Sequence, residues 1–379
     1  MESFLKLVAA DLYKHTEGNL AHTAVVFPNK RAGLFFNEYL AQESESPIWS
    51  PAYVSISELF RSLSPWEVGD PVKLVCELYK IFRRETQSTE TLDDFYFWGE
   101  MLISDFDDAD KNKVDTDKLF SNLQDLRYIM DDYTFIDDEQ EEAIRQFFQN
   151  FSIERRTALK ERFISLWDVL GNIYKGFRES LASQNIAYEG MMYRHVIEHL
   201  NVDKLPYEKY VFVGFNVLNK VEHTLFTQLK DAGKAVFYWD YDEFYMKENR
   251  QAVTHEAGEF IRRNLRDFPS PLSGELFKNL SKPKEVHYIA SSTENAQARY
   301  LPQWIRNNLT TPEKETAVVL CNEALLQPVL HSLPAEVKHV NITMGFPLSQ
   351  TPVYSFLIAL LELNTHGFNF TSGRYTFHS

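Results

Sequence analysis

The stretch Thr23-Ala-Val-Val-Phe27, which is followed by Pro28-Asn29, decides the fold. Its apolar and β-branched residues before a turn-forming pair predict a strand buried on both faces, as in a parallel sheet. The run Lys-Tyr-Val-Phe-Val at 209–213 has the same character. A helical pattern follows each run, at 30–41 and 220–229, so strand and helix alternate along the chain. We therefore expect an α/β protein with a parallel sheet.

Other segments extend this alternation. Further strands are expected from similar runs at 53–56, 234–239, 284–289 and 316–320. On the helix at 30–41, the spacing predicts that Leu34, Phe35 and Leu40 face the core. From Leu159 to Leu181, apolar residues recur every three or four positions, which is typical of a helix.

These patterns predict three regions. Residues 1–62 and 205–275 form a first, discontinuous α/β domain, and residues 63–204 form an all-helical insertion. Residues 280–379 form the start of a second α/β domain. The Pro- and Ser-rich stretch at 268–274 separates the two α/β domains.

Composition excludes several protein classes. The chain has 379 residues, of which 44% are hydrophobic, so it can bury a large core and is not disordered. Its longest apolar runs are far shorter than the roughly 18 residues of a membrane-spanning helix. Two cysteines cannot form a disulfide framework, and the N-terminus lacks a secretion signal. We expect a cytoplasmic protein without a membrane partner.

The negative charge is concentrated in one segment. The net charge is −15, and residues 86–144 hold 18 acidic and 4 basic residues, which leaves the remainder of the chain at −1. Such a block is typical of a solvated helical face or a surface that docks a basic partner. It argues against phosphate contacts within this segment, because DNA binding requires Lys and Arg.

Motifs for catalysis are incomplete. Gly233-Lys234-Ala235 lacks the first glycine and the hydroxyl of a phosphate-binding loop, and it precedes a strand instead of following one. His195-Val-Ile-Glu198-His199 fits an inverted zinc-hydrolase motif, but no third ligand is evident, so two histidines at a helix end remain the alternative. We find neither a nucleophile elbow nor the paired strand motifs of restriction-type nucleases.

Two carboxylates follow the strand expected at 234–239. Asp240 and Asp242 could in principle hold magnesium. Carboxylates at strand ends are more often helix caps and turn formers. We therefore expect a structural role for both residues and no metal site.

Seven stretches, in order along the chain, match the pattern of one family. They are 24–36, 55–60, 97–106, 210–216, 291–296, 316–322 and 341–348. Together they resemble AddB-like proteins of the Bacteroidetes type, the nuclease-bearing second subunits of bacterial helicase–nuclease recombination complexes. The resemblance implies degenerate RecA-like, superfamily 1 helicase-like domains with a large helical insertion. The stretches from 291 onward resemble the opening of the second motor domain.

Departures from the family pattern concern ATP chemistry. No phosphate-binding loop precedes Thr23, and Val213-Gly214-Phe215-Asn216 stands where motor ATPases carry an acidic pair for magnesium. Cys321-Asn322 stands where helicases place an arginine that reaches the γ-phosphate. The resemblance therefore implies a scaffold that does not turn over ATP and holds neither cofactor nor metal. The family's PD-(D/E)xK nuclease domain lies C-terminal to this region, so we expect the chain to be an N-terminal portion.

The expected function follows from this resemblance. It is a non-catalytic module of an ATP-dependent helicase–nuclease complex for DNA double-strand-break processing, which contacts single-stranded DNA and an AddA-like motor helicase subunit. Candidate DNA-binding residues are Asn29, Lys30, Arg31, Ser291, Ser292 and Thr343. The first three combine two cations with helix N-terminal amides, groups that bind phosphate. The alternative interpretation is that Lys30 and Arg31 are simply exposed to solvent at the start of a helix.

Two other functions remain open from the sequence. One is a protein-interaction scaffold with an acidic helical docking domain and no nucleic-acid role. The other is an active enzyme, either an ATPase or a metal hydrolase built on the motif at 195–199.

Overall fold

The computed structural model describes residues 3–16, 18–44, 46–120, 156–246, 256–308, 313–366, 369–371 and 374–376. For residues 156–168, 314, 366, 369–371 and 374–376 it describes the backbone alone. The chain divides into two compact units, Met1–Lys282 and Pro283–Ser379.

A four-stranded parallel sheet forms the centre of the first unit. Its strands are β1 (Thr23–Phe27), β2 (Ala52–Ser55), β5 (Lys209–Val213) and β6 (Ala235–Tyr238). They lie in the order β2-β1-β5-β6, and all three neighbouring pairs are parallel. All five residues of β1 are buried, which confirms the prediction of a buried strand. The expected α/β class with a parallel sheet is confirmed.

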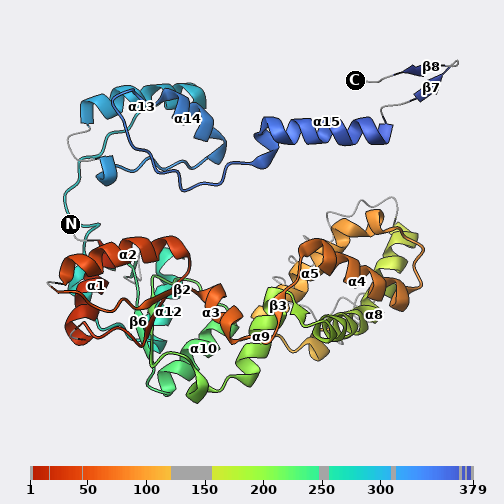
Figure 1. The fold of residues 1–379 in the computed structure, drawn as a ribbon, viewed down its shortest axis with the longest axis horizontal. Coiled ribbons are helices and arrows are strands. Elements are labelled where there is room, and N and C mark those ends of the chain that lie inside the picture. Colours follow the sequence, from red (N-terminus) through yellow and green to blue (C-terminus); the bar gives the residue numbers. More distant parts are fainter. Residues whose placement is uncertain are drawn as a thin grey trace, which may run out of the picture. The chain divides into compact units, whose positions relative to one another are not determined.

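Helices cover both faces of the sheet (Figure 1). On one face, α1 (Phe4–Thr16) and α2 (Lys30–Glu43) pack against Val25 and Phe27. On the other face, Ala24 and Val26 join a larger core with α3 (Ile56–Leu63), α10 (Lys220–Asp231) and α12 (Glu259–Asp267). This division follows from the alternation of side chains along a strand.

The predicted buried face of α2 is wrong at two positions. Leu34 is 74% exposed and Phe35 is 45% exposed. The helix instead buries Gly33, Phe36 and Leu40, which follow the spacing of one helical stripe. Gly33 permits this orientation because its backbone approaches Tyr53 closely: an added Cβ would lie 3.3 Å from the Tyr53 Cβ.

A helical region follows the first two strands of the sheet. It contains α4 (Pro71–Thr86), α5 (Leu92–Lys111), α8 (Arg156–Ser183) and α9 (Glu189–His199). Asp70 caps α4 ahead of Pro71, and Thr91 forms a capping box with Asp94 at the start of α5. Figure 1 shows α4, α5 and α8 side by side.

The core of the helical region is continuous with the core beneath the sheet. Ile173, Phe177 and Leu181 on α8 are fully buried in the same cluster as Val26 of β1. This confirms the C-terminal part of the predicted stripe, while the side chains of Leu159, Phe163 and Leu166 lie outside the described residues. The short strands β3 (Glu67–Val68) and β4 (Ile186–Ala187) pair in parallel where the chain passes into and out of α4, α5 and α8.

The described residues of the second unit form the α-helices α13 (Glu294–Asn308), α14 (Leu326–Ser332) and α15 (Pro352–His366) and a hairpin of β7 (Asn369–Thr371) and β8 (Arg374–Thr376). The strands expected at 284–289 and 316–320 are not formed. Neither segment joins a sheet of the described residues, and side chains such as Val286 and Val319 are 58% and 82% exposed. A β-rich run becomes a strand only when another strand pairs with it, which local sequence does not specify.

The remaining elements are short. They are the helix α11 (Glu243–Met246) and the 3₁₀ helices Val202–Lys204, Glu256–Gly258, Gly274–Phe277, Glu313–Glu315, Glu323–Leu325 and Leu348–Gln350. Among the residues that the structure describes, none of the helices combines the length and the apolar character needed to cross a bilayer.

Candidate nucleic-acid interface at the carboxyl edge of the sheet

The order of the strands marks one place on the sheet as a candidate site. The chain passes from β1 to β2 in one direction and then to β5 and β6 on the other side of β1. The order therefore reverses between β1 and β5. In open parallel sheets, ligands bind outside the carboxyl ends of the strands at such a reversal. Pro28-Asn29 follows β1 at this point, and Gly214 follows β5.

Asn29 occupies the position where a phosphate-binding loop would offer free amides. Its backbone is extended, and its side-chain oxygen accepts hydrogen bonds from the backbone N–H groups of Arg31 at 3.1 Å and Ala32 at 3.4 Å. The cap thus satisfies two of the first-turn donors of α2. A phosphate at this helix end would compete with the Asn29 side chain for the same donors.

Lys30 is paired within the protein. Its ammonium group contacts the Glu58 carboxylate, and Glu58 also accepts a hydrogen bond from the backbone N–H of Ser55 at 2.9 Å. The hydrogen bond from Lys30, followed by that from Ser55, lowers the pKa of Glu58 below its ordinary value. The Lys30 side chain remains 76% exposed, so an incoming phosphate can reach it.

Arg31 is the accessible cation of this group. Its side chain is exposed and makes no ion pair within the described part of the chain. Leu34 and Phe35, the two residues exposed contrary to prediction, lie three and four positions further along α2. Residues at these spacings share one helical face. The face therefore combines a guanidinium group with an exposed aromatic ring.

The sequence pattern did not predict this combination, because it assigned Phe35 to the core. An exposed ring provides a surface for base stacking, and a nearby arginine can bind phosphate, which is how many proteins hold single strands. The signal in the sequence is the spacing of Gly33, Phe36 and Leu40, which places these three residues on one helical face and leaves Phe35 beside it.

The carboxyl ends of β5 and β6 are engaged in structural contacts. The backbone oxygen of Asn216 accepts a hydrogen bond from the Asn264 side chain at 2.6 Å. Asp242 accepts bonds from the backbone N–H groups of Phe244, Asn279 and Leu280 at 3.0, 2.7 and 2.8 Å. Asp242 is thus a turn former, in agreement with the structural interpretation. Burial raises the pKa of Asp240, which disfavours its charged form.

The motif at 195–199 is organised by stacking. The His195 ring lies 4.2 Å from the Trp66 ring and 4.2 Å from the His199 ring, measured between centroids. Arg194 donates to the Glu198 carboxylate at 3.0 Å. Within the described ranges, no cluster of three or more His, Cys, Asp or Glu side chains has the arrangement of a metal site.

The remaining candidates belong to the second unit. The Ser291 hydroxyl donates to the backbone oxygen of Thr293 at 3.2 Å, just before α13. Ser292 and Thr343 are exposed and lie outside helices and strands. The structure thus brings Asn29, Lys30 and Arg31 together at one helix start, whereas Ser291, Ser292 and Thr343 are part of the other unit.

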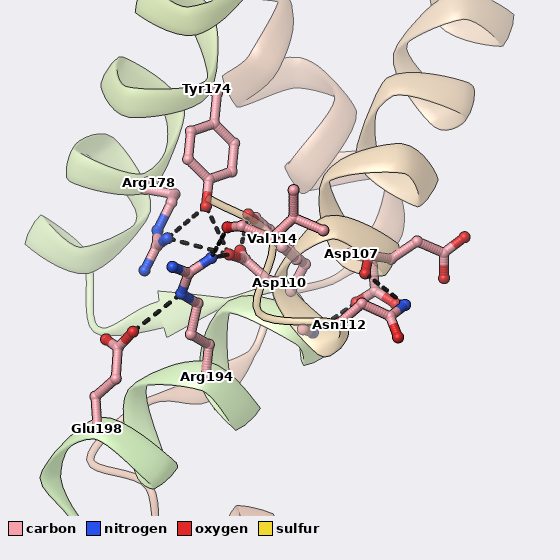
Figure 2. A network of polar contacts seen from close by, with 11 residues as sticks. Asp107, Asp110, Asn112, Val114, Tyr174, Arg178, Arg194 and Glu198 are labelled. Carbon is pink, nitrogen blue, oxygen red and sulfur yellow. Dashed lines mark hydrogen bonds and ion pairs between the residues drawn. The ribbon is translucent and has the colours of Figure 1, made fainter. Parts of the chain in front are cut away.

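An extensive polar network lies in the helical region and joins α5, α8 and α9 (Figure 2). The Asp110 carboxylate is 0% exposed. It accepts hydrogen bonds from Tyr174 at 2.6 Å, Tyr188 at 2.5 Å, Arg178 at 3.1 Å and Arg194 at 3.3 Å. Burial, followed by the Asp110 charge, raises the pKa of Tyr174 to about 12. Each of these groups has a partner, so this network holds helices together and exposes no reactive group.

A second contact reinforces the same junction. The backbone N–H of Gly190, at the start of α9, donates to the Asp107 carboxylate at 2.5 Å. Lys111 lies 2.6 Å from Asp107 and 3.4 Å from Glu189. These bonds fix the start of α9 on the last turns of α5. The acidic residues of this part of α5 are therefore partly used within the protein.

Comparison with known proteins identifies no relative of this chain. No protein-family model matches this chain, and no curated protein matches it.

Proposed function

We propose that this chain is a non-catalytic, helicase-like module of an AddB-like helicase–nuclease complex. In this role it holds single-stranded DNA and docks on an AddA-like motor subunit. Its sheet is then the first of two degenerate RecA-like domains. The observation that carries the proposal is the exposed face of Arg31, Leu34 and Phe35 on α2, beside the point where the strand order reverses.

The state of the loop after β1 supports a role without ATP turnover. Nucleotide-binding loops at this position leave their amides free for phosphate oxygens. Here Asn29 caps those amides, and Glu58 engages the adjacent Lys30. The phosphates of a flexible DNA strand can bind to the exposed cations without using the capped amides. DNA binding is therefore compatible with this loop.

The helical region supports the second half of the proposal. Its acidic helix α5 also exposes two aromatic side chains, Phe97 at 67% and Trp98 at 44%. Exposed aromatic residues are common at the centres of protein interfaces, and an acidic rim suits a basic partner. We assign this surface to the motor subunit, since the acidic residues repel DNA.

The α2 face can be tested by fluorescence anisotropy with a labelled oligothymidine long enough to fill a site of about 4–16 nucleotides. Replacing both Lys30 and Arg31 with Ala should reduce the slope of log K against log salt by about 0.7 for each phosphate that the variant no longer neutralises. Phe35→Ala should weaken binding by about 1–3 kcal/mol with an unchanged slope, because base stacking releases no counterions.

Matched controls come from the helical region. The double variant Lys80→Ala/Arg84→Ala removes two exposed cations whose side chains are 66% and 62% accessible, and Phe97→Ala removes a ring that is also exposed. Both controls should bind the strand like the unchanged chain. If the α2 variants and the controls behave alike, the α2 face is not the DNA site. Clear DNA-stimulated ATP hydrolysis would contradict the non-catalytic assignment.

A protein-interaction scaffold is the second candidate function, favoured by the exposed Phe97 and Trp98 on the acidic helix. It predicts no strand binding at any salt concentration, together with capture of a motor subunit that is abolished in Phe97→Ala.

A further inference from the structure

Glu58 on α3 lies beside the first turn of α2 because of the register of the sheet. Phe27, the last residue of β1, pairs with Ser55, the last residue of β2. Lys30 lies three positions after Phe27, and Glu58 lies three positions after Ser55. Since the two strands are parallel, both side chains come to the same carboxyl edge of the sheet.

The Glu58 carboxylate is held in place through one of its two oxygens. Oε2 accepts hydrogen bonds from the backbone N–H of Ser55 at 2.9 Å and from the Ser55 hydroxyl at 3.0 Å. These bonds belong to the capping box that starts α3. The other oxygen, Oε1, contacts the ammonium group of Lys30. The carboxylate is therefore a fixed group, whereas the Lys30 ammonium, on a side chain that is 76% exposed, ends a flexible stem.

The two adjacent cations of α2 differ in their internal partners. Lys30 faces the Glu58 carboxylate, whereas Arg31 makes no ion pair within the described residues. A phosphate that approaches Lys30 therefore meets a negative charge at short range and competes with it for the ammonium group. Because exposed ion pairs are weak, this competition lowers the affinity for phosphate without preventing binding.

We propose that Glu58 is a positioning residue that competes with DNA phosphates for Lys30 and so limits the affinity of the α2 face for single-stranded DNA. This inference rests on the proposed function. The strand is then held mainly by the Arg31 guanidinium group and the Phe35 ring, and it dissociates more readily. A strand that a motor subunit pulls across this face must be released in this way. Because phosphate carries no sequence information, the effect of Glu58 is the same for every base sequence.

Glu58→Gln tests the proposal with little disturbance of the fold, because Gln retains an oxygen that can accept the bonds from Ser55. The variant should bind a labelled oligothymidine about two- to fivefold more tightly than the unchanged chain at low salt. The slope of log K against log salt should become steeper by up to about 0.7, because Lys30 then neutralises one further phosphate.

Two controls assign this change to the pair of Lys30 and Glu58. Lys30→Ala/Glu58→Gln should have the same slope as Lys30→Ala, because neither variant has an ammonium group at this position. Glu77→Gln removes an equivalent charge on α4, where Glu77 contacts Lys80 at 2.7 Å and accepts a hydrogen bond from Ser180 at 3.4 Å. It should change neither the affinity nor the slope.

The proposal is wrong if Glu58→Gln binds the strand with the affinity and slope of the unchanged chain. It is also wrong if Glu77→Gln has the same effect as Glu58→Gln, or if the slope becomes steeper without Lys30. A second probe, tripolyphosphate, carries phosphates but no bases, and its binding can be followed by the backbone amide NMR signals of residues 30–33.

Tripolyphosphate separates a failure of this proposal from a failure of the proposed function. It should bind Glu58→Gln more tightly than the unchanged chain. If this gain appears while neither protein binds the labelled strand, the competition for Lys30 is supported and the DNA-binding role is wrong. If the strand binds but Glu58→Gln gains affinity for neither probe, the DNA-binding role stands and Glu58 does not limit it.

Discussion

Replacement of Asp110 by Asn should destabilise the first unit by about 3 kcal/mol. Asn keeps the shape of the side chain but removes the charge that Arg178 and Arg194 face. Breaking a buried ion pair from one side costs about 3–5 kcal/mol, because the remaining charge has no partner. We take the lower end since the two arginine side chains are 24% and 18% exposed, and Arg194 keeps its bond to Glu198.

Urea unfolding followed by far-UV circular dichroism measures this destabilisation. With a slope of about 3 kcal/mol per molar urea, the midpoint should fall by about 1 M. Asp117→Asn is the matched control, because this carboxylate is 73% exposed and pairs with Lys175, which is 57% exposed. Exposed pairs contribute about 0–1 kcal/mol, so the control midpoint should hardly move.

The difference between the two variants shows whether the buried network stabilises the protein. If Asp110→Asn and Asp117→Asn shift the midpoint equally, the buried network does not stabilise the packing of α5, α8 and α9. Amide hydrogen exchange locates the effect: faster exchange should appear first in these three helices.

Two further variants test neighbouring features. Gly190→Ala should cost about 1–3 kcal/mol, because its Cβ would lie 2.3 Å from the backbone oxygen of Asp107, whereas Gly345→Ala meets no atom within 4 Å and should be nearly neutral in the same unfolding assay. Equal stability of the two variants would show that α9 can move away from α5 at little cost. Burial, and then the charge of His199, lowers the pKa of His195 below its ordinary 6.5, so the unfolded chain binds the proton more readily. The resulting stability should be complete above about pH 6.5 and decline as the pH falls below it, and His195→Gln should flatten this dependence in unfolding midpoints measured across that range. An identical pH profile in His195→Gln would exclude His195 as the responsible group.

Local sequence patterns predicted the central strands of the parallel sheet. The strands at 23–27 and 209–213 were predicted with the bounds observed, because runs buried on both faces are distinctive. The runs at 284–289 and 316–320 looked alike in sequence, yet neither forms a strand. Whether a run pairs depends on residues far away, so the same signal succeeded in one unit and failed in the other.

The sites show the same limit. The helix predicted to start at Lys30 does start there, because the turn residues before it and the cap at Asn29 act locally. The exposure of Phe35 depends on which side of α2 packs against β1 and β2. A rotation of the helix by one residue would exchange the buried and exposed positions. The Asp110 network joins residues 64 to 84 positions apart, so its acidic member looked like any other carboxylate of a charged helix.

The continuity of the large core has a mechanical consequence. Ala24 and Val26 of the sheet belong to the same apolar cluster as Phe177 and Leu181 of α8. The segments Glu67–Val68 and Ile186–Ala187 pair with each other where the chain enters and leaves the helical region. We therefore expect α4, α5 and α8 to move together with the strands as one rigid body when a force is applied to the helices. A body that grips the helices would turn the sheet with them, and tilting one against the other would require breaking apolar contacts throughout the interior.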